Sequence, residues 1–147
     1  MPPITVSTEV DRPAEDVFAY ATDPTRFSEW QAGVVAGRLD PPGVPAVGTR
    51  CLTTRRIGFA DRQSTSEVVR IDPPRAWAVR GVDGPIRALV EVAVEALTAH
   101  RSRLTISVDF EGHGVGKLLV PLVVRREAAK EMPASVAALK RRLEGSA

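Results

Sequence analysis

In two segments of the chain, within residues 87–96 and 103–110, apolar side chains recur at every second position. This pattern is typical of antiparallel strands that bury one face and expose the other. One face of the predicted sheet is therefore dry and has to be covered by another element. The apolar positions that define this face are Val90, Val92 and Val94 in the first segment and Leu104, Ile106, Val108 and Phe110 in the second.

Similar segments, separated by turn-forming residues, predict about six to seven strands in all. Because the loops between most of them are short, we expect an antiparallel meander. The predicted strands span Ile4–Val10, Gly33–Leu39, Thr49–Arg55, Asp61–Ile71, Ala76–Gly81, Arg87–Ala96 and Arg103–Phe110.

Two short helices are predicted after the first strand, because Pro13 and Asp23-Pro24 are typical helix starts. A long helix, from about Val115 to Leu143, ends the chain. At 1.5 Å per residue it is roughly 42 Å long, so it has to cross the whole domain and the sheet has to curve around it. Pro121 and Pro133 are expected to interrupt it.

Composition limits the function. The 147 residues predict one domain, residues 1–147, and the formal charge of +2 is too small to indicate nucleic acid as a partner. With Cys51 as its only cysteine and no apolar leader, the chain is expected to be cytoplasmic. The apolar run from Leu118 to Val124 is too short for stable membrane insertion. A homodimer is left open.

Several short motifs occur in a characteristic order along nearly the whole chain. Together they resemble the START-like helix-grip superfamily, also called SRPBCC or polyketide cyclase/dehydrase-type proteins. The motifs are Pro13-Ala-Glu-Asp-Val-Phe-Ala-Tyr20, Asp23-Pro-Thr-Arg-Phe-Ser-Glu-Trp30, Gly48-Thr49-Arg50, Ile71-Asp-Pro-Pro74 and Asp109-Phe-Glu-Gly112.

The resemblance implies an α+β helix-grip fold, in which a curved antiparallel sheet wraps around the C-terminal helix and leaves an apolar cavity between them. The first hypothesis for function is binding or transport of an apolar small molecule such as a lipid, an isoprenoid or a polyketide-like compound. The alternative is a polyketide cyclase, aromatase or dehydratase that acts in the same cavity. A third hypothesis is an interaction module that a partner protein contacts at the cavity mouth.

The residues expected to contact the ligand come from the dry strand faces, the second short helix and the inner side of the long helix. Trp30 also resembles the aromatic residue that many family members carry at the end of the second short helix. The full predicted set is Phe27, Trp30, Glu67, Trp77, Val79, Arg80, Val92, Ile106, Leu119, Leu122 and Val123.

The position of Glu67 depends on strand register. If Val69 and Ile71 face the interior, Glu67 does too, and it could then pair with Arg80 or Arg55. In the other register Val68 faces inward and Glu67 lies in water, unless a bulge intervenes.

We find little in the sequence that indicates catalysis. His100 and His113 lack neighbours at metal-ligand spacing, and Cys51 has no histidine near it in sequence. For the enzyme alternative the candidates are Trp30, Glu67, Arg80 and Tyr20. We therefore predict no catalytic residue, no metal and no cofactor.

Overall fold

The structure, a computed structural model, describes residues 3–145, without the side chains of residues 57, 118, 119, 121 and 122. The predicted order of strands and helices is confirmed. The elements are β1 (Ile4–Val10), α1 (Ala14–Ala21), η1 (Pro24–Glu29), β2 (Val34–Asp40), β3 (Arg50–Ile57), β4 (Ala60–Asp72), β5 (Ala76–Gly81), β6 (Ile86–Thr98), β7 (Arg101–Gly112), α2 (Gly116–Leu119), η2 (Val120–Val124) and α3 (Arg125–Gly145).

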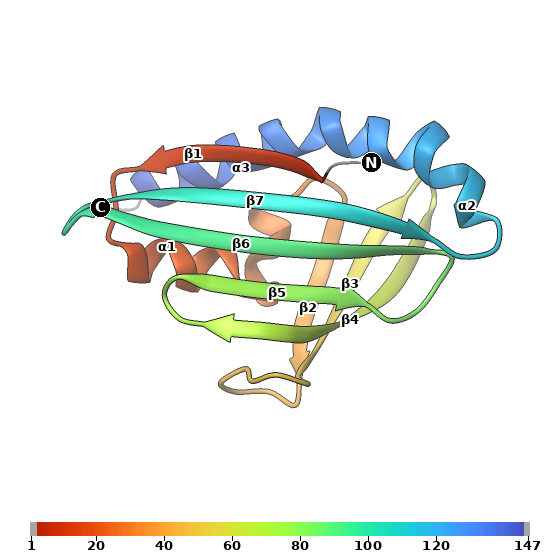
Figure 1. The fold of residues 1–147 in the computed structure, drawn as a ribbon, viewed down its shortest axis with the longest axis horizontal. Helices are drawn as coiled ribbons and strands as arrows, with labels where there is room; N and C mark the ends of the chain where they lie inside the picture. Colours follow the sequence, from red (N-terminus) through yellow and green to blue (C-terminus); the bar gives the residue numbers. More distant parts are fainter. Residues whose placement is uncertain (1–2, 146–147) are drawn as a thin grey trace.

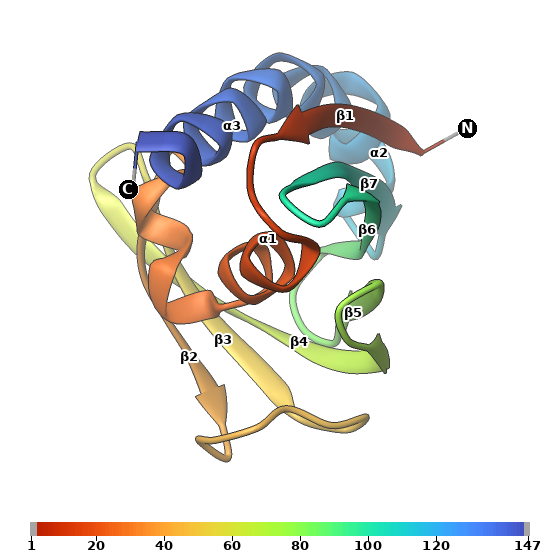
Figure 2. The ribbon, with the colours of Figure 1, turned by 90° about the vertical axis from the view of Figure 1, so that its left-hand side faces the viewer.

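The strands form one antiparallel sheet in the order β1-β7-β6-β5-β4-β3-β2. Strands β2 to β7 make the expected meander, and β1 pairs with β7, a pairing that the sequence had left open (Figure 1). The sheet curves strongly from β1 to β2. Seen end-on, it curls around α1 while α3 crosses above it (Figure 2). This is the helix-grip architecture.

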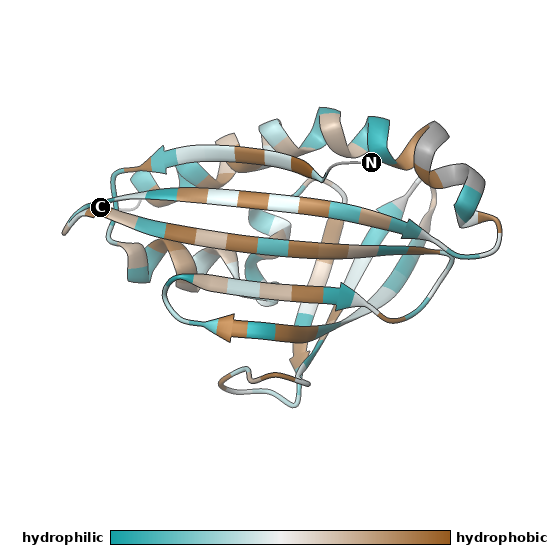
Figure 3. Ribbon diagram, viewed as in Figure 1, coloured by the Kyte–Doolittle hydropathy of each residue, from teal (hydrophilic) through white to brown (hydrophobic). Residues whose placement is uncertain are grey.

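The register of the pairs separates an inner face from an outer one. On one rung of β5, β6, β7 and β1, Trp77 lies opposite Val92, Val92 opposite Ile106, and Ile106 opposite Val6. Since residues opposite each other share a face of the sheet, this rung points toward the helices. The alternation along β6 and β7 is visible as bands of brown and pale or teal (Figure 3).

Three helical elements cover the inner face. Helix α3 packs mainly along β1, and α1 packs on β6 and β7. Asp23 caps η1 by accepting a hydrogen bond from the Thr25 amide, as the sequence predicted. Helix η1 lies so close to β2 that a Cβ atom at Gly37 would overlap the carbonyl oxygen of Pro24. Glycine at this position therefore lets η1 close one end of the fold.

The predicted terminal helix is not uniform. A π-helical segment, η2, interrupts it at Val120–Val124, and Pro121 lies in this segment. A π turn is a common way to accommodate a break in the regular hydrogen-bond ladder. In contrast, α3 runs through Pro133 as one helix, so helical structure is interrupted at only one of the two prolines. No helix in residues 3–145 is both long enough and apolar enough to cross a bilayer.

The inner side of α3 is expected to dominate the stability of the fold. Leu139 is fully buried in the core, whereas Val123 on η2 is half exposed. Leu139→Ala should lower the free energy of unfolding by about 2–5 kcal/mol, because it leaves a cavity in the core. Val123→Ala, the matched control, should cost less than about 1 kcal/mol. Urea unfolding followed by circular dichroism measures both, and equal losses would contradict this account of the core.

Candidate functional site

The interior between sheet and helices is the first candidate site. Six residues predicted to line it are buried in the core cluster, although their contact with a ligand stays a prediction. Leu119 and Leu122 were predicted as well, but their side chains lie outside the described part. Val123 is 50% exposed and lies outside the buried core, and its contact with a ligand also stays a prediction. The six buried residues are Phe27, Trp30, Trp77, Val79, Val92 and Ile106.

The two tryptophans bring polar atoms into this apolar interior. Trp30 is 7% exposed and Trp77 is 3% exposed, and no group in the described part of the chain accepts a hydrogen bond from either indole N–H. An edge-to-face contact with the Phe27 ring, 5.8 Å between centroids, orients the Trp30 indole. A buried donor without an acceptor costs about 1–3 kcal/mol. These two N–H groups are therefore the least satisfied polar atoms of the core.

Glu67 lies on the outer face, because a bulge resets the register of β4. Val68 is opposite Val79, and Arg70 is opposite Ala78, so Val69 is the extra residue. As a result Val68 and Ile71 both face inward, and Glu67 and Val69 do not. The inward alternative for Glu67, which assumed a regular strand through Val69 and Ile71, is wrong for this physical reason.

Arg80 shares the outer face with Glu67. The two residues lie opposite each other on β5 and β4, yet no ion pair joins them in the described structure. Arg80 lines a hollow of about 190 Å³ on this face, together with Asp109, Glu111 and residues 87–89 and 110. The predicted contribution of Glu67 and Arg80 to ligand binding is untested, but neither side chain lies on the inner face.

Acidic residues are confined to the outer face of the sheet. Following the cross-strand pairs from Trp77 and Val79, the described inner-face positions of the seven strands carry no Asp, Glu or His. The inner face does carry Cys51, which is 3% exposed, and burial raises the pKa of its thiol to about 11. At neutral pH this thiol is protonated and is not a nucleophile.

Sequence analysis missed Arg55 as a site residue. Arg55 shares the inner face with Cys51, and its Nη2 donates a hydrogen bond to Oε1 of Gln31 at 3.0 Å. Water reaches the side chain, but the surrounding protein desolvates the guanidinium and lowers its pKa, while Glu131 on α3 acts in the opposite direction. The hairpin turn after Ile57 fixes the pairing of β3 with β4, which places Arg55 on the same face as Cys51. This turn is the sequence signal that could have identified Arg55.

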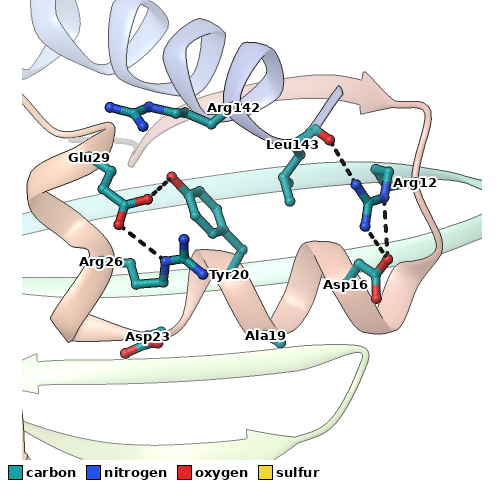
Figure 4. A pocket seen from close by; sticks show the side chains of 9 residues that line it. All are labelled: Arg12, Asp16, Ala19, Tyr20, Asp23, Arg26, Glu29, Arg142 and Leu143. Atoms are coloured by element: carbon teal, nitrogen blue, oxygen red, sulfur yellow. Dashed lines mark hydrogen bonds and ion pairs between the residues drawn. The ribbon is translucent and has the colours of Figure 1, made fainter. Parts of the chain in front are cut away.

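A second hollow, of about 360 Å³, lies where α1 and η1 meet the end of α3. Its three arginines and three carboxylates balance in formal charge (Figure 4). Arg12 donates hydrogen bonds to Asp16 and to the carbonyl of Leu143, which joins α1 to the end of α3. The polar lining residues are Arg12, Asp16, Tyr20, Asp23, Arg26, Glu29 and Arg142.

Within this hollow Tyr20 and Glu29 form the central hydrogen bond. The Tyr20 hydroxyl donates to Oε1 of Glu29 at 2.9 Å, and the Arg26 guanidinium lies 5.0 Å from the Tyr20 ring centroid while it pairs with Glu29 (Figure 4). Desolvation, followed by the bond to Glu29, raises the pKa of Tyr20 to about 12. Arg26, followed by Tyr20, lowers the pKa of Glu29. These side chains satisfy one another, which indicates a clamp between helices rather than a catalytic group.

The chain matches a known protein-family model over nearly its whole length. Residues 1–144 match the family described as polyketide cyclase / dehydrase and lipid transport. The chain belongs to this family. No sequence among the curated proteins compared matches the chain.

Solved structures similar to this family member share its fold at low sequence identity. A START superfamily protein from Mycobacterium smegmatis aligns with a TM-score of 0.76 and 15% identity over 100% of both chains. The Zhui aromatase/cyclase from Streptomyces sp. R1128 aligns with a TM-score of 0.68 and 16% identity, covering 98% of this chain and 97% of that one. At such identities the similarity shows the fold and not the activity.

A two-domain relative has the same fold in part of its length. The di-domain ARO/CYC BexL of the BE-7585A biosynthetic pathway aligns with a TM-score of 0.76 and 16% identity over 98% of this chain. The present chain spans about half of that protein, 47% of its length. The family description includes both cyclases and lipid transport, so it does not decide between the two functions.

Tyr20 is the only tyrosine, so its ionisation can be followed alone by ultraviolet absorbance at 295 nm. The folded protein should ionise this phenol near pH 12 rather than near 10.0. Because the folded state holds the proton more tightly, stability should fall as the pH rises between these two values. Glu29→Gln should bring the transition closer to the ordinary value without reaching it, since desolvation remains. Ionisation of the wild-type phenol near pH 10 would contradict the buried, hydrogen-bonded geometry.

Proposed function

We propose that the protein binds and carries an apolar small molecule in the interior between the curved sheet and α3. The ligand class is a lipid, an isoprenoid or a polyketide-like molecule that carries at least one oxygen acceptor. The observation that supports this proposal most directly is the pair of buried indole N–H groups of Trp30 and Trp77, for which no described residue supplies an acceptor. A carbonyl, hydroxyl or ether oxygen of a ligand is an acceptor for either N–H group.

The apolar character of the remaining interior supports the same proposal. Val79, Val92 and Ile106 belong to the same core cluster as the tryptophans, and their aliphatic side chains fit an apolar ligand skeleton. Small-molecule sites combine such surfaces with a few well-placed polar groups. The two indoles supply polar groups of this kind, because each presents one donor to an otherwise apolar surface.

The alternative is a cyclase, aromatase or dehydratase that acts in the same interior. Such chemistry needs a positioned acid or base within hydrogen-bond reach of the substrate. The described inner-face positions of the strands carry no carboxylate or imidazole, the Cys51 thiol is protonated at neutral pH, and the Tyr20 hydroxyl is bonded to Glu29. These placements favour a carrier over an enzyme.

The environment-sensitive ketone prodan tests the proposal, with N-phenyl-1-naphthylamine as an aromatic probe that lacks a carbonyl. Trp30→Phe and Trp77→Phe keep an aromatic ring and remove the N–H group. At least one of them should weaken prodan binding by about threefold to tenfold, the value of one hydrogen bond, and should leave the amine probe within about twofold. Fluorescence titration gives both affinities.

Glu67→Gln is the matched control because Glu67 lies on the outer face. It should leave the affinity for both probes unchanged. The proposal fails if neither probe binds the wild-type protein, and the role of the indoles fails if both Trp variants bind prodan as the wild type does.

A further inference from the structure

Two successive rungs of the β3–β4 hairpin carry arginine in different surroundings. On the outer face Arg56 lies opposite Asp61, and its Nε is 2.9 Å from Oδ1 of that carboxylate. On the next rung Arg55 lies opposite Arg62. Directly opposed residues have Cβ atoms about 4.5–5.5 Å apart, and like charges in this arrangement destabilise a sheet. On the outer face Asp61 neutralises the charge of Arg56, whereas on the inner face the like charges of Arg55 and Arg62 repel each other.

The Arg55–Arg62 rung belongs to the inner face. Cys51, four residues before Arg55 on the same regular strand, is buried in the core opposite Ser66. Alternate residues of a strand share a face, so the side chains of Arg55 and Arg62 leave the sheet on the same side as Cys51. The hydrogen bond from Arg55 to Gln31 confirms this direction, because Gln31 directly follows Trp30 in the chain.

The charge of this rung is not balanced by the described protein. Glu131 on α3 influences Arg55, but the two form no ion pair within 4.0 Å. Arg62 makes no hydrogen bond or ion pair with any described residue, and Arg55 makes only the bond to Gln31. Both guanidinium groups thus have free donors, and Arg55 lies beside the end of η1, where it contacts Gln31 next to Trp30. Guanidinium groups bind oxyanions strongly and often through two parallel hydrogen bonds.

We propose that Arg55 and Arg62 form an anion-binding end of the ligand site, and that the ligand is an apolar molecule with one carboxylate or comparable oxyanion. This inference rests on the proposed function, since it assigns the head of the same ligand whose apolar part occupies the interior. An oxyanion between the two guanidinium groups replaces their repulsion by two attractive contacts. The indole N–H groups in the interior and the guanidinium groups on the hairpin are all hydrogen-bond donors. Both parts of the site therefore favour a ligand that supplies hydrogen-bond acceptors.

A pair of probes with the same skeleton isolates the charge. 1-Anilinonaphthalene-8-sulfonate carries one sulfonate, and N-phenyl-1-naphthylamine is its uncharged counterpart. Arg55→Gln and Arg62→Gln should each weaken binding of the sulfonate about tenfold and change binding of the uncharged probe by less than twofold. Added sodium chloride should weaken the sulfonate complex of the wild-type protein more than the uncharged one, because salt screens the charges. Fluorescence titration measures all of these affinities.

Arg56→Gln on the neighbouring rung is the matched control, since it removes the same charge from the other face. It should leave the sulfonate affinity within twofold of the wild type. Arg62 is an exposed residue, so Arg62→Gln carries the test if Arg55→Gln does not fold.

Three results separate the possible failures. If both probes bind and neither inner-face variant affects the sulfonate, the anion-binding end is wrong and the proposed function stands. If Arg56→Gln weakens the sulfonate as much as Arg55→Gln does, the effect is general surface charge and the inference is overturned. If neither probe binds the wild-type protein, the proposed function itself fails.

Discussion

The structure depends on one constraint: a curved seven-stranded sheet has a concave apolar face that has to be covered. Helix α3 covers it along β1, α1 covers β6 and β7, and η1 packs on β2 at the other side of the sheet. The helices do not contact this concave face evenly, because α3 packs along the edge strand β1 rather than across every strand. The buried part becomes core, and the side chains left around it become candidates for a site. Fold and function therefore follow from the same geometric mismatch.

The sequence was sufficient for the order of elements and for the buried apolar residues. Period-two alternation identified β6 and β7, and the Asp23-Pro24 start placed η1 correctly. Both signals are local, since each depends on a few neighbouring side chains. The pairing of β1 with β7 is not local, because it depends on how the whole sheet curves, and the pattern within β1 does not contain that information.

The site residues that the sequence did not place correctly also depend on features that a regular local pattern does not contain. Glu67 could not be placed because one extra residue, Val69, changes which side of β4 faces inward. The exposure of Val123 could not be derived from a regular helix, because Val123 lies within the π turn at η2. Arg55 and Arg62 resemble ordinary surface charges in the sequence, and only their pairing across the hairpin shows that they share the inner face.

The two faces of the sheet differ in charge as well as in polarity. The outer face carries the acids, many of them beside arginine, as in the contacts of Glu9 with Arg101 and of Glu95 with Arg103. The inner face carries arginine but no described acid on the strands. The sheet thus separates charge between its two faces, with donors and apolar side chains on the inner one and paired charges on the outer one.

The bulge at Val69 has a consequence for how this fold can vary. Removing that one residue would leave Val68 and Ile71 on the same face as they are now, because it would simply make the alternation regular. The local bend and extra twist that a bulge adds would be lost. Sequences with and without this residue would then present identical inner side chains on sheets of different curvature. A single-codon insertion or deletion is thus a route by which the curvature of this sheet can change without a change in any inward-facing side chain.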